Sequence, residues 1–324
     1  MPCVVPCSLA TVLAGLALRI KHRGRLAARP PPRLCDGMEI VLIHTGGTIG
    51  MVPSPDGLVP ERGRVERAVE ALMPTGARLT THLFDPLLDS ADVGPDDWNR
   101  MLDLIDAHPG ASILVTHGTD TMSFTGAALA QALAGRDVRV ILCGAMAPLG
   151  AGEGARANLT LAVATLIAPG WTGVKCAFAQ KIMEAGGLIK HDTRGDDAFR
   201  SVPQDPVGPP ETRRFDPDRR LAVLALTPGL PASALSGALA ALDGAVLRVF
   251  GAGTVMHDAE VHAALAGAVS QGKRIRAVSQ CEGGGLAPGH YAAGAALWAA
   301  GVENGGRETP EAALVKLWLA GGRS

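Results

Sequence analysis

Short, unbroken runs of apolar and β-branched residues alternate along this chain with longer segments in which apolar residues recur at helical spacing. An apolar run suits a strand covered on both faces, and strands separated by helices form parallel sheets built from βαβ units. The predicted strands are 39–44, 112–116, 138–142, 173–179, 221–226, 245–249 and 274–279. The predicted helices are 95–107, 121–134, 155–167, 232–241 and 258–271. The sequence therefore predicts an α/β fold with parallel sheets.

Two domains are expected from the chain length and from one proline-rich stretch. The 324 residues exceed the roughly 150 of an average domain. Residues 201–220 contain five prolines and many charged residues, a composition typical of a linker. We therefore predict a larger N-terminal parallel-sheet domain with flanking helices at 38–200, a linker at 201–218, and a smaller C-terminal α/β domain at 219–324.

Residues 1–37 differ in composition from the rest of the chain. An uncharged apolar stretch, 1–18, precedes a basic cluster, which reverses the order of a secretory signal. The stretch also contains Pro6 and is short for a membrane span. Met38 leads directly into a strand pattern, so we favour translation starting at Met38. An organelle transit peptide is the alternative, because the segment is rich in Arg and poor in acids.

Charge and composition exclude several classes of protein. Residues 1–37 hold six Lys or Arg and one acid, so the net charge of −1 leaves the remainder at −6. An acidic body with 3% aromatic residues argues against a nucleic-acid partner. The six cysteines form no C-x-x-C pair and the nine histidines no H-x-x-x-H pair, so we expect no metal site. A reducing, cytoplasmic setting without a membrane partner fits best.

Polar, glycine-containing motifs follow two of the predicted strands. The first reads Thr45-Gly46-Gly47-Thr48-Ile49-Gly50, and the second reads His117-Gly118-Thr119-Asp120-Thr121. Ligands of open parallel sheets bind beyond the carboxyl ends of the strands. The first motif is neither G-x-G-x-x-G nor a phosphate loop with its Lys, so it gives little support for nucleotide binding. Without further information, the first is also a plain glycine turn, and Thr119 or Asp120 is also a plain helix cap.

Together, these motifs resemble the signatures of the bacterial-type L-asparaginase family, and the likeness extends from Met38 to about Leu319. Further matching blocks are Pro86-Leu87-Leu88-Asp89-Ser90-Ala91-Asp92, Lys190 with Asp197-Ala198-Phe199, Leu247-Arg248, and Ser279-Gln280-Cys281. The blocks around Asp89-Ser90 and Gln280-Cys281 look more like the cytoplasmic, type I branch than the periplasmic one. The resemblance implies hydrolysis of L-asparagine to L-aspartate and ammonia without a cofactor, with glutaminase activity as a minor side reaction.

The resemblance also implies roles for individual residues. Thr48 would attack the side-chain amide and form an acyl-enzyme, and Thr119, Lys190 and Asp120 would form the proton relay. Backbone N–H groups near Thr119 would form part of the oxyanion hole, and Thr119 would also contact the substrate. Asp120 would bind the substrate α-ammonium group. The α-carboxylate would be bound by Ser90, and by Asp89 through its backbone. From spacing alone, Lys190 would be assigned to a solvated loop.

The sequence departs from the family pattern at several positions. Leu58 stands where the flexible loop often carries a Tyr, and the only Tyr of this chain is Tyr291. Thr254 replaces an Asn that relatives contribute to a neighbouring subunit's site. Arg248 matches an Arg of the second, regulatory asparagine site in some type I enzymes. Ile189 replaces a polar residue before the catalytic Lys, which argues against a retained allosteric site.

The resemblance implies a homodimer or a dimer of dimers, because relatives place their sites at subunit contacts. Two other functions stay open on the same fold. One is the ammonia-generating subunit of a tRNA-dependent amidotransferase, although those proteins carry an additional N-terminal domain that 37 residues are too few to form. The other is a non-catalytic amino-acid binding protein, although binding alone does not need two threonines and a buried base.

Overall fold

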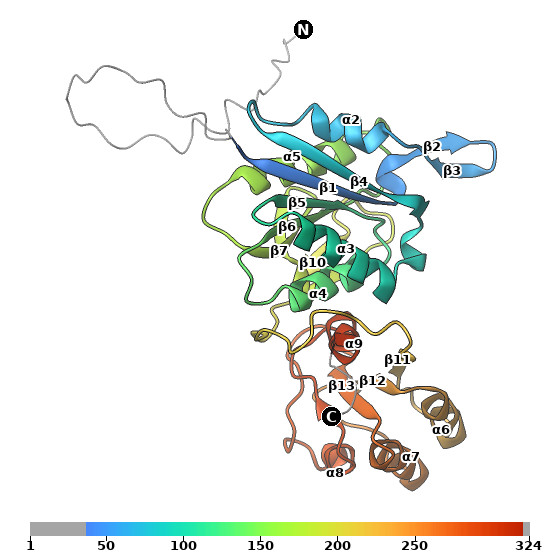
Figure 1. The fold of residues 1–324 in the computed structure, drawn as a ribbon. Helices are drawn as coiled ribbons and strands as arrows, with labels where there is room; N and C mark the ends of the chain where they lie inside the picture. Colours follow the sequence, from blue (N-terminus) through green and yellow to red (C-terminus); the bar gives the residue numbers. More distant parts are fainter. Residues whose placement is uncertain (1–36, 320–324) are drawn as a thin grey trace, which may run out of the picture. The chain divides into compact units, whose positions relative to one another are not determined.

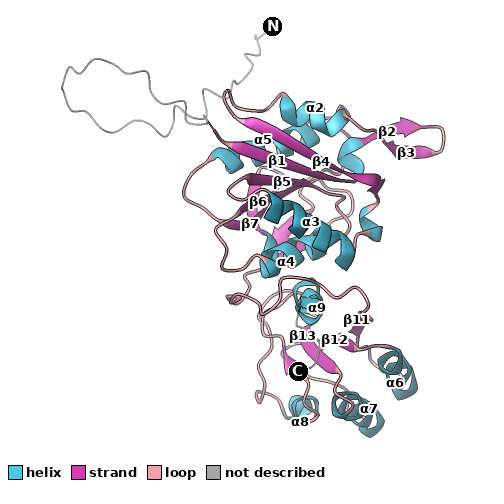
Figure 2. Ribbon diagram, in the orientation of Figure 1, coloured by secondary structure: helices cyan, strands magenta, loops and turns pink. Residues whose placement is uncertain are grey.

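The computed structural model describes residues 37–319, and its largest sheet has six strands in the order β4-β1-β5-β6-β7-β8 (Figures 1 and 2). The first five are parallel, and β8 runs antiparallel to β7. These strands are β1 (Glu39–Gly46), β4 (Arg78–Leu88), β5 (Ser112–Thr116), β6 (Arg139–Cys143), β7 (Gly173–Phe178) and β8 (Lys181–Glu184). The parallel arrangement brings the carboxyl ends of β4, β1 and β5 together at one edge.

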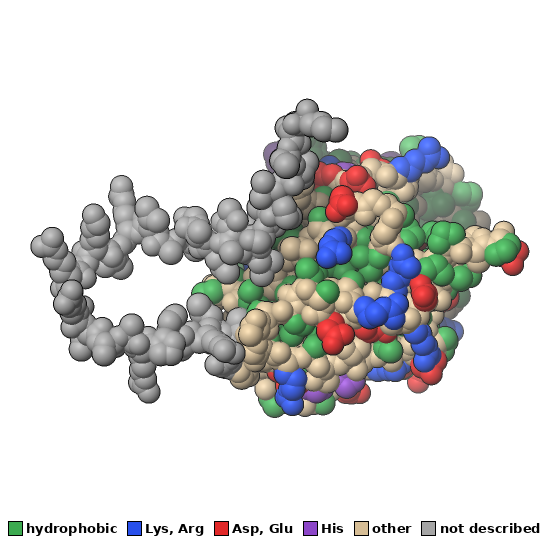
Figure 3. Space-filling model, turned by 90° about the horizontal axis from the view of Figure 1, so that it is seen from above, with side chains coloured by type: hydrophobic (Ala, Val, Ile, Leu, Met, Phe, Trp, Pro, Cys, Tyr) green, Lys and Arg blue, Asp and Glu red, His purple; other side chains and the backbone are tan. Residues whose placement is uncertain are grey.

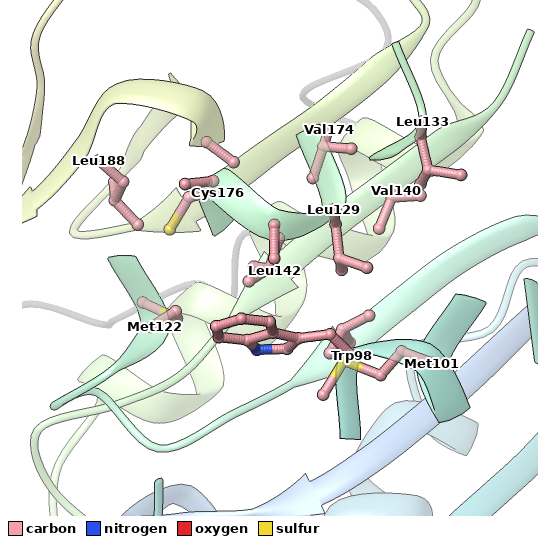
Figure 4. Packing of buried hydrophobic residues seen from close by; sticks show 14 of the residues in the cluster. Trp98, Met101, Met122, Leu129, Leu133, Val140, Leu142, Val174, Cys176 and Leu188 are labelled. Atoms are coloured by element: carbon pink, nitrogen blue, oxygen red, sulfur yellow. The ribbon is translucent and has the colours of Figure 1, made fainter. Parts of the chain in front are cut away.

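Helices cover both faces of this sheet, which explains why the middle residues of its central strands are apolar on both faces. Alternate residues of a strand point to opposite faces. In β1, Val41 and Ile43 pack in the core under helices α3 (Pro95–Ala107) and α4 (Met122–Ala132). Ile40 and Leu42 pack in the core under α2 (Arg64–Glu70) and α5 (Gly154–Ile167). Figure 4 shows the α3–α4 side, where Trp98 lies beside Met101 and Leu142.

A second, smaller sheet has four parallel strands in the order β11-β12-β13-β14. Its strands are β11 (Leu221–Ala225), β12 (Gly244–Val249), β13 (Arg274–Ser279) and β14 (Glu303–Asn304). Apolar residues of α6 (Ala232–Ala241), α7 (Ala259–Ser270) and α8 (Ala295–Ala299) pack with it into one core. The predicted fold class, a larger parallel-sheet domain and a smaller C-terminal α/β domain, is therefore confirmed.

The last helix, α9 (Pro310–Leu319), contributes to two cores. Ala312 and Val315 belong to the core beneath α3 and α4. Leu314 and Leu317 belong to a core with Val246 of β12 on the other face of the smaller sheet. The apolar residues of α9 are therefore buried against both cores.

All seven predicted strands and all five predicted helices are present, with ends that agree within three residues. The longest strand that the sequence analysis does not predict is β4. It forms an edge strand and carries polar residues such as Thr80, Thr81 and His82 between its apolar ones. The antiparallel β8 was also not expected. It follows a tight turn in which Ala179 and Gln180 adopt positive φ, a conformation that apolar periodicity does not reveal.

Between β10 (Phe199–Ser201) and β11, residues 202–220 contain no helix or strand. The placement of the domain boundary within 201–218 stays a prediction. The proposed extension, residues 1–37, lies outside the described residues except for Gly37. Within 37–319, no helix is both long and apolar enough to cross a membrane. On the face in Figure 3, basic and acidic side chains are interspersed.

Candidate active site

Three turns that follow neighbouring strands form the floor of the site. The strand β1 ends at Gly46 and leads into a short 3-10 helix that starts at Thr48. The edge strand β4 leads into a second 3-10 helix that starts at Ser90. The turn after β5 carries Thr119 and connects to α4. Because these strands are parallel neighbours, hydroxyl groups from distant parts of the sequence meet at one sheet edge.

The two glycines before Thr48 allow these turns to pack against each other. Gly46 and Gly47 both have positive φ, of 130° and 85°. A Cβ atom on Gly46 would lie 2.2 Å from the carbonyl oxygen of Leu88. A Cβ atom on Gly47 would lie 2.4 Å from the Cα atom of Gly118. The glycine pair is thus required by backbone contact and not only by the turn.

The side-chain nitrogen of Lys190 joins the site from a different part of the fold. Lys190 ends the short strand β9 (Leu188–Lys190), where it pairs with Phe199 of β10. Its Nζ donates to Thr119 Oγ1 at 2.9 Å and to Asp120 Oδ1 at 2.5 Å. The Lys190 side chain is 15% exposed, whereas that of Asp120 is 71% exposed. The solvated-loop interpretation of Lys190 is therefore wrong.

The capping interpretation of the second motif is also wrong. The N-cap of α4 is Thr121, and its backbone receives no side-chain cap. The Thr121 hydroxyl instead donates to the backbone carbonyl of Ser90 and ties the β4 turn to the β5 turn. Thr119 and Asp120 are consequently free of the helix and bind Lys190.

The predicted site residues surround one small pocket of about 190 Å³. Such a volume has room for a ligand the size of a single amino acid. The lining residues are Gly47, Thr48, Met51, Asp89, Ser90, Gly118, Thr119, Asp120, Met146, Lys190 and Thr193. A larger hollow of about 700 Å³ lies at the opposite strand ends, near Gly110 and Val138, and contains none of the predicted site residues.

Ser90 and Asp89 differ in their surroundings. Ser90 is 4% exposed, and a Cβ on Gly118 would lie 2.7 Å from its Oγ, so the two turns are in close contact here. Asp89 accepts the backbone N–H of Ala91 at 2.9 Å and thereby caps its 3-10 helix. The Ser90 hydroxyl is therefore held at the pocket wall by a turn that is fixed at both ends.

Two neutral histidines lie beneath these turns. His44 lies at the end of β1, with Nδ1 2.7 Å from Thr116 Oγ1, and His117 follows β5. Both are fully buried, and burial lowers the pKa of each from 6.5 to about 4. Neither imidazole lines the pocket, so they belong to its support.

Some of the highlighted residues lie elsewhere. Leu58 is in the exposed β2–β3 hairpin (Met51–Ser54 and Gly57–Pro60), and it does not line the pocket. Thr254 forms a bridge with Phe250, and Arg248 of β12 donates to the backbone carbonyl of Gln280 at 3.2 Å. Their roles in specificity and regulation stay predictions.

Sequence reasoning missed three residues that line the pocket: Met51, Met146 and Thr193. Met146 follows the end of β6, and this position after a parallel strand could have identified it as a residue of the site. Thr193 lies in the loop after Lys190 and gives no such signal. Among the described residues 37–319, no group of three or more His, Cys, Asp or Glu is arranged to hold a metal ion.

Comparison with known proteins agrees with this arrangement. The family model "Asparaginase, N-terminal" matches residues 39–220, and "Glutaminase/Asparaginase C-terminal domain" matches 220–324. L-asparaginase 1 of Escherichia coli (strain K12) is 31% identical over 308 residues, covering 86% of this chain and 90% of that protein. The chain therefore belongs to the asparaginase family, and the resemblance noted in the sequence is confirmed.

Solved structures give the same result for the fold. The thermostable L-asparaginase from Thermococcus kodakarensis is similar with a TM-score of 0.75 at 27% identity, covering 87% of this chain and 92% of that one. L-asparaginase I from Vibrio cholerae O1 biovar eltor str. N16961 has a TM-score of 0.73 at 28% identity, with the same coverage. Both domains of the chain are thus represented in proteins of this family.

Proposed function

We propose that this protein hydrolyses L-asparagine to L-aspartate and ammonia through an acyl-enzyme on Thr48. The observation that carries the proposal is the position of Lys190 Nζ, within hydrogen-bonding distance of both Thr119 Oγ1 and Asp120 Oδ1 at the wall of the Thr48 pocket. A binding protein has no need of two hydroxyl groups and a shielded lysine amine around one ligand. A hydrolase that transfers an acyl group needs a nucleophile and a proton relay.

The proposed reaction has two steps that use the same groups. The Thr48 hydroxyl attacks the side-chain amide carbon, and its proton passes through Thr119 to the Lys190 amine, which Asp120 orients. The relay returns a proton to the leaving nitrogen, the C–N bond breaks, and ammonia departs. Water then attacks the ester, gives its proton to the same relay, and releases L-aspartate with Thr48 restored. Each proton taken up is thus returned within the cycle.

Two groups of pocket residues would orient the substrate. Asp120 is exposed enough to meet an incoming α-ammonium group while one of its oxygens holds Lys190. The Ser90 hydroxyl and the backbone at Asp89 bind the α-carboxylate. The pocket of about 190 Å³ has room for one amino acid, and we propose asparagine as the main substrate with minor activity on glutamine.

The same proposal includes the cellular location and the assembly of the protein. We propose that it is cytoplasmic and forms a homodimer or a dimer of dimers. Each subunit would fold into domains at 38–200 and 219–324. Free thiols support a reducing compartment, since Cys143, Cys176 and Cys281 are all unbridged. Burial raises the pKa of the Cys143 thiol to about 12, so it is no competing nucleophile. The two family models meet at residue 220, which supports the domain division.

Two measurements test these proposals. Light scattering of the purified protein tests the oligomeric state, and N-terminal mass analysis of native protein tests whether translation starts at Met38.

The decisive experiment measures ammonia release from L-asparagine and L-glutamine by the wild type and Thr48→Ala. The matched control is Thr193→Ala, which removes a different hydroxyl from the same pocket. Turnover of asparagine that is lost in Thr48→Ala and keeps its kcat in Thr193→Ala supports the reaction and the nucleophile. Activity that survives in Thr48→Ala keeps the reaction but moves the nucleophile, with Thr119 next. Tight binding of asparagine without turnover by the wild type would overturn the proposal in favour of a binding protein.

A further inference from the structure

A chain of buried hydrogen bonds links the site to helices α3 and α4. Trp98 Nε1 of α3 donates to Thr125 Oγ1 of α4 at 3.0 Å. Thr125 Oγ1 is 2.9 Å from His117 Nε2, and His117 Nδ1 is 2.7 Å from the carbonyl oxygen of Gly118. Trp98, Thr125 and His117 are 2%, 0% and 0% exposed. Figure 4 shows Trp98 held among core residues such as Met101 and Leu142.

Only one assignment of protons is compatible with all three of these hydrogen bonds. A carbonyl oxygen can only accept, so His117 Nδ1 must carry a proton. The ring is neutral, with a pKa lowered by burial to about 4, so Nε2 is an acceptor and takes the Thr125 hydroxyl proton. The Thr125 oxygen in turn accepts the Trp98 N–H. Every buried polar atom of the three side chains is then paired, and the imidazole is fixed in a single tautomer.

The consequence for the site follows from the planarity of the peptide bond. The Gly118–Thr119 bond is trans, so the Gly118 carbonyl and the Thr119 N–H point in opposite directions. The imidazole holds the carbonyl on the core side, and the N–H therefore points away from the core. Thr119 is only 8% exposed and lines the pocket, yet no acceptor for its backbone N–H is found among residues 37–319. A backbone N–H group that has no partner within the protein and faces a pocket is available to a ligand.

We propose that His117, fixed by Thr125 and Trp98, is a positioning residue that aims the Thr119 N–H at the oxyanion formed during amide hydrolysis. The inference rests on the proposed function and adds to it three residues that do not touch substrate. A preorganised donor stabilises the oxyanion more than the ground-state carbonyl. Its misalignment should therefore lower kcat and leave KM nearly unchanged.

The test is Thr125→Val, which keeps the shape of the side chain and removes the hydroxyl that fixes the ring. We expect kcat for L-asparagine to fall about tenfold, less than for complete loss of an oxyanion donor, with KM within about twofold. Thr125→Ser restores the hydroxyl and should recover kcat. The matched control is Ser123→Ala on the same helix, because the Ser123 hydroxyl is equally buried and has no partner among the described residues. It should leave kcat unchanged.

Several outcomes would overturn the inference without touching the proposed function. One is an unchanged kcat per folded Thr125→Val enzyme, which would reduce the chain to a structural role. Another is a raised KM with unchanged kcat. If Thr125→Val fails to fold, the ¹⁵N spectrum of wild-type histidines decides, because a His117 ring protonated at Nε2 contradicts the assignment. Absence of asparagine turnover by the wild type would instead defeat the proposed function itself.

Discussion

The two buried histidines should make the free energy of unfolding depend on pH above the range in which carboxylates titrate. In the folded protein the pKa of His44 and of His117 is lowered from 6.5 to about 4 by burial. In the unfolded chain each returns to an ordinary value. Between these two values the unfolded chain therefore binds more protons than the folded protein. Stability must then fall as pH falls, starting near 6.5 and ending near 4.

The size of the effect follows from the same shift. A displacement of about 2.5 pKa units corresponds to roughly 3 kcal/mol per histidine when the titration is complete. Over the accessible range from pH 7.5 to 5.5, each histidine contributes a loss of about 1.3 kcal/mol by the same linkage. His44 and His117 together then give about 2.7 kcal/mol. The partly buried His82, whose pKa is also lowered, chiefly by burial, adds in the same direction.

Urea unfolding at pH 7.5 and 5.5 measures this loss, and His44→Gln isolates one contribution. Glutamine does not titrate and still offers a hydrogen-bonding group to Thr116 Oγ1. The pH-dependent loss should be about 1.3 kcal/mol smaller in His44→Gln than in the wild type, whatever His82 contributes. His290→Gln, which removes an exposed imidazole, is the control and should keep the wild-type loss. Equal losses in the wild type and His44→Gln would refute the assignment of His44 as a buried neutral base.

Three further perturbations test the site and the smaller sheet. Gly47→Ala places a methyl group 2.4 Å from Gly118 at positive φ, so unfolding in urea should show a loss of roughly 2–5 kcal/mol, together with lost turnover. Lys190→Met keeps the apolar stem, so ammonia assays should show kcat reduced at least about 100-fold, with a circular dichroism spectrum like that of the wild type. Arg276→Met removes the 2.5 Å ion pair with the half-buried Glu308 and leaves Lys316 as the remaining cation beside that carboxylate, so it should cost roughly 1–3 kcal/mol in urea unfolding while changing kcat little.

Much of the fold could be predicted because its central strands obey one simple rule. Residues 113–115 and 140–142 are buried on both faces, so their side chains are apolar whichever way they point. Such runs are recognised without knowing which helices cover them. The edge strand β4 does not obey this rule. Its polar residues are tolerated because it has a neighbour on one side only, and the sequence alone does not reveal that position.

The site was predictable to the extent that its residues lie in continuous motifs. Thr48 follows two glycines, and Thr119 follows Gly118. Glycines at these positions indicate that the backbone there approaches another segment closely. Lys190 has no such sign: it ends a three-residue strand and is preceded by two apolar residues. Its role depends on β9, which places Nζ beside Thr119 from 71 residues away. A contact of this kind is a property of the fold, and only the family resemblance allowed Lys190 to be named in advance.

The role of His117 could not be predicted from the sequence either, although this residue lies within a continuous motif. His117 lies inside the second motif, yet its sequence context does not distinguish a residue that meets substrate from one that supports the turn. The distinction comes from burial and from the partners of its two nitrogens, Gly118 and Thr125. These partners place the ring behind the turn, where it can influence the reaction only through the Gly118–Thr119 peptide. The role of a polar residue within a catalytic motif can therefore be assigned only when its burial and all hydrogen-bond partners of its side chain are known.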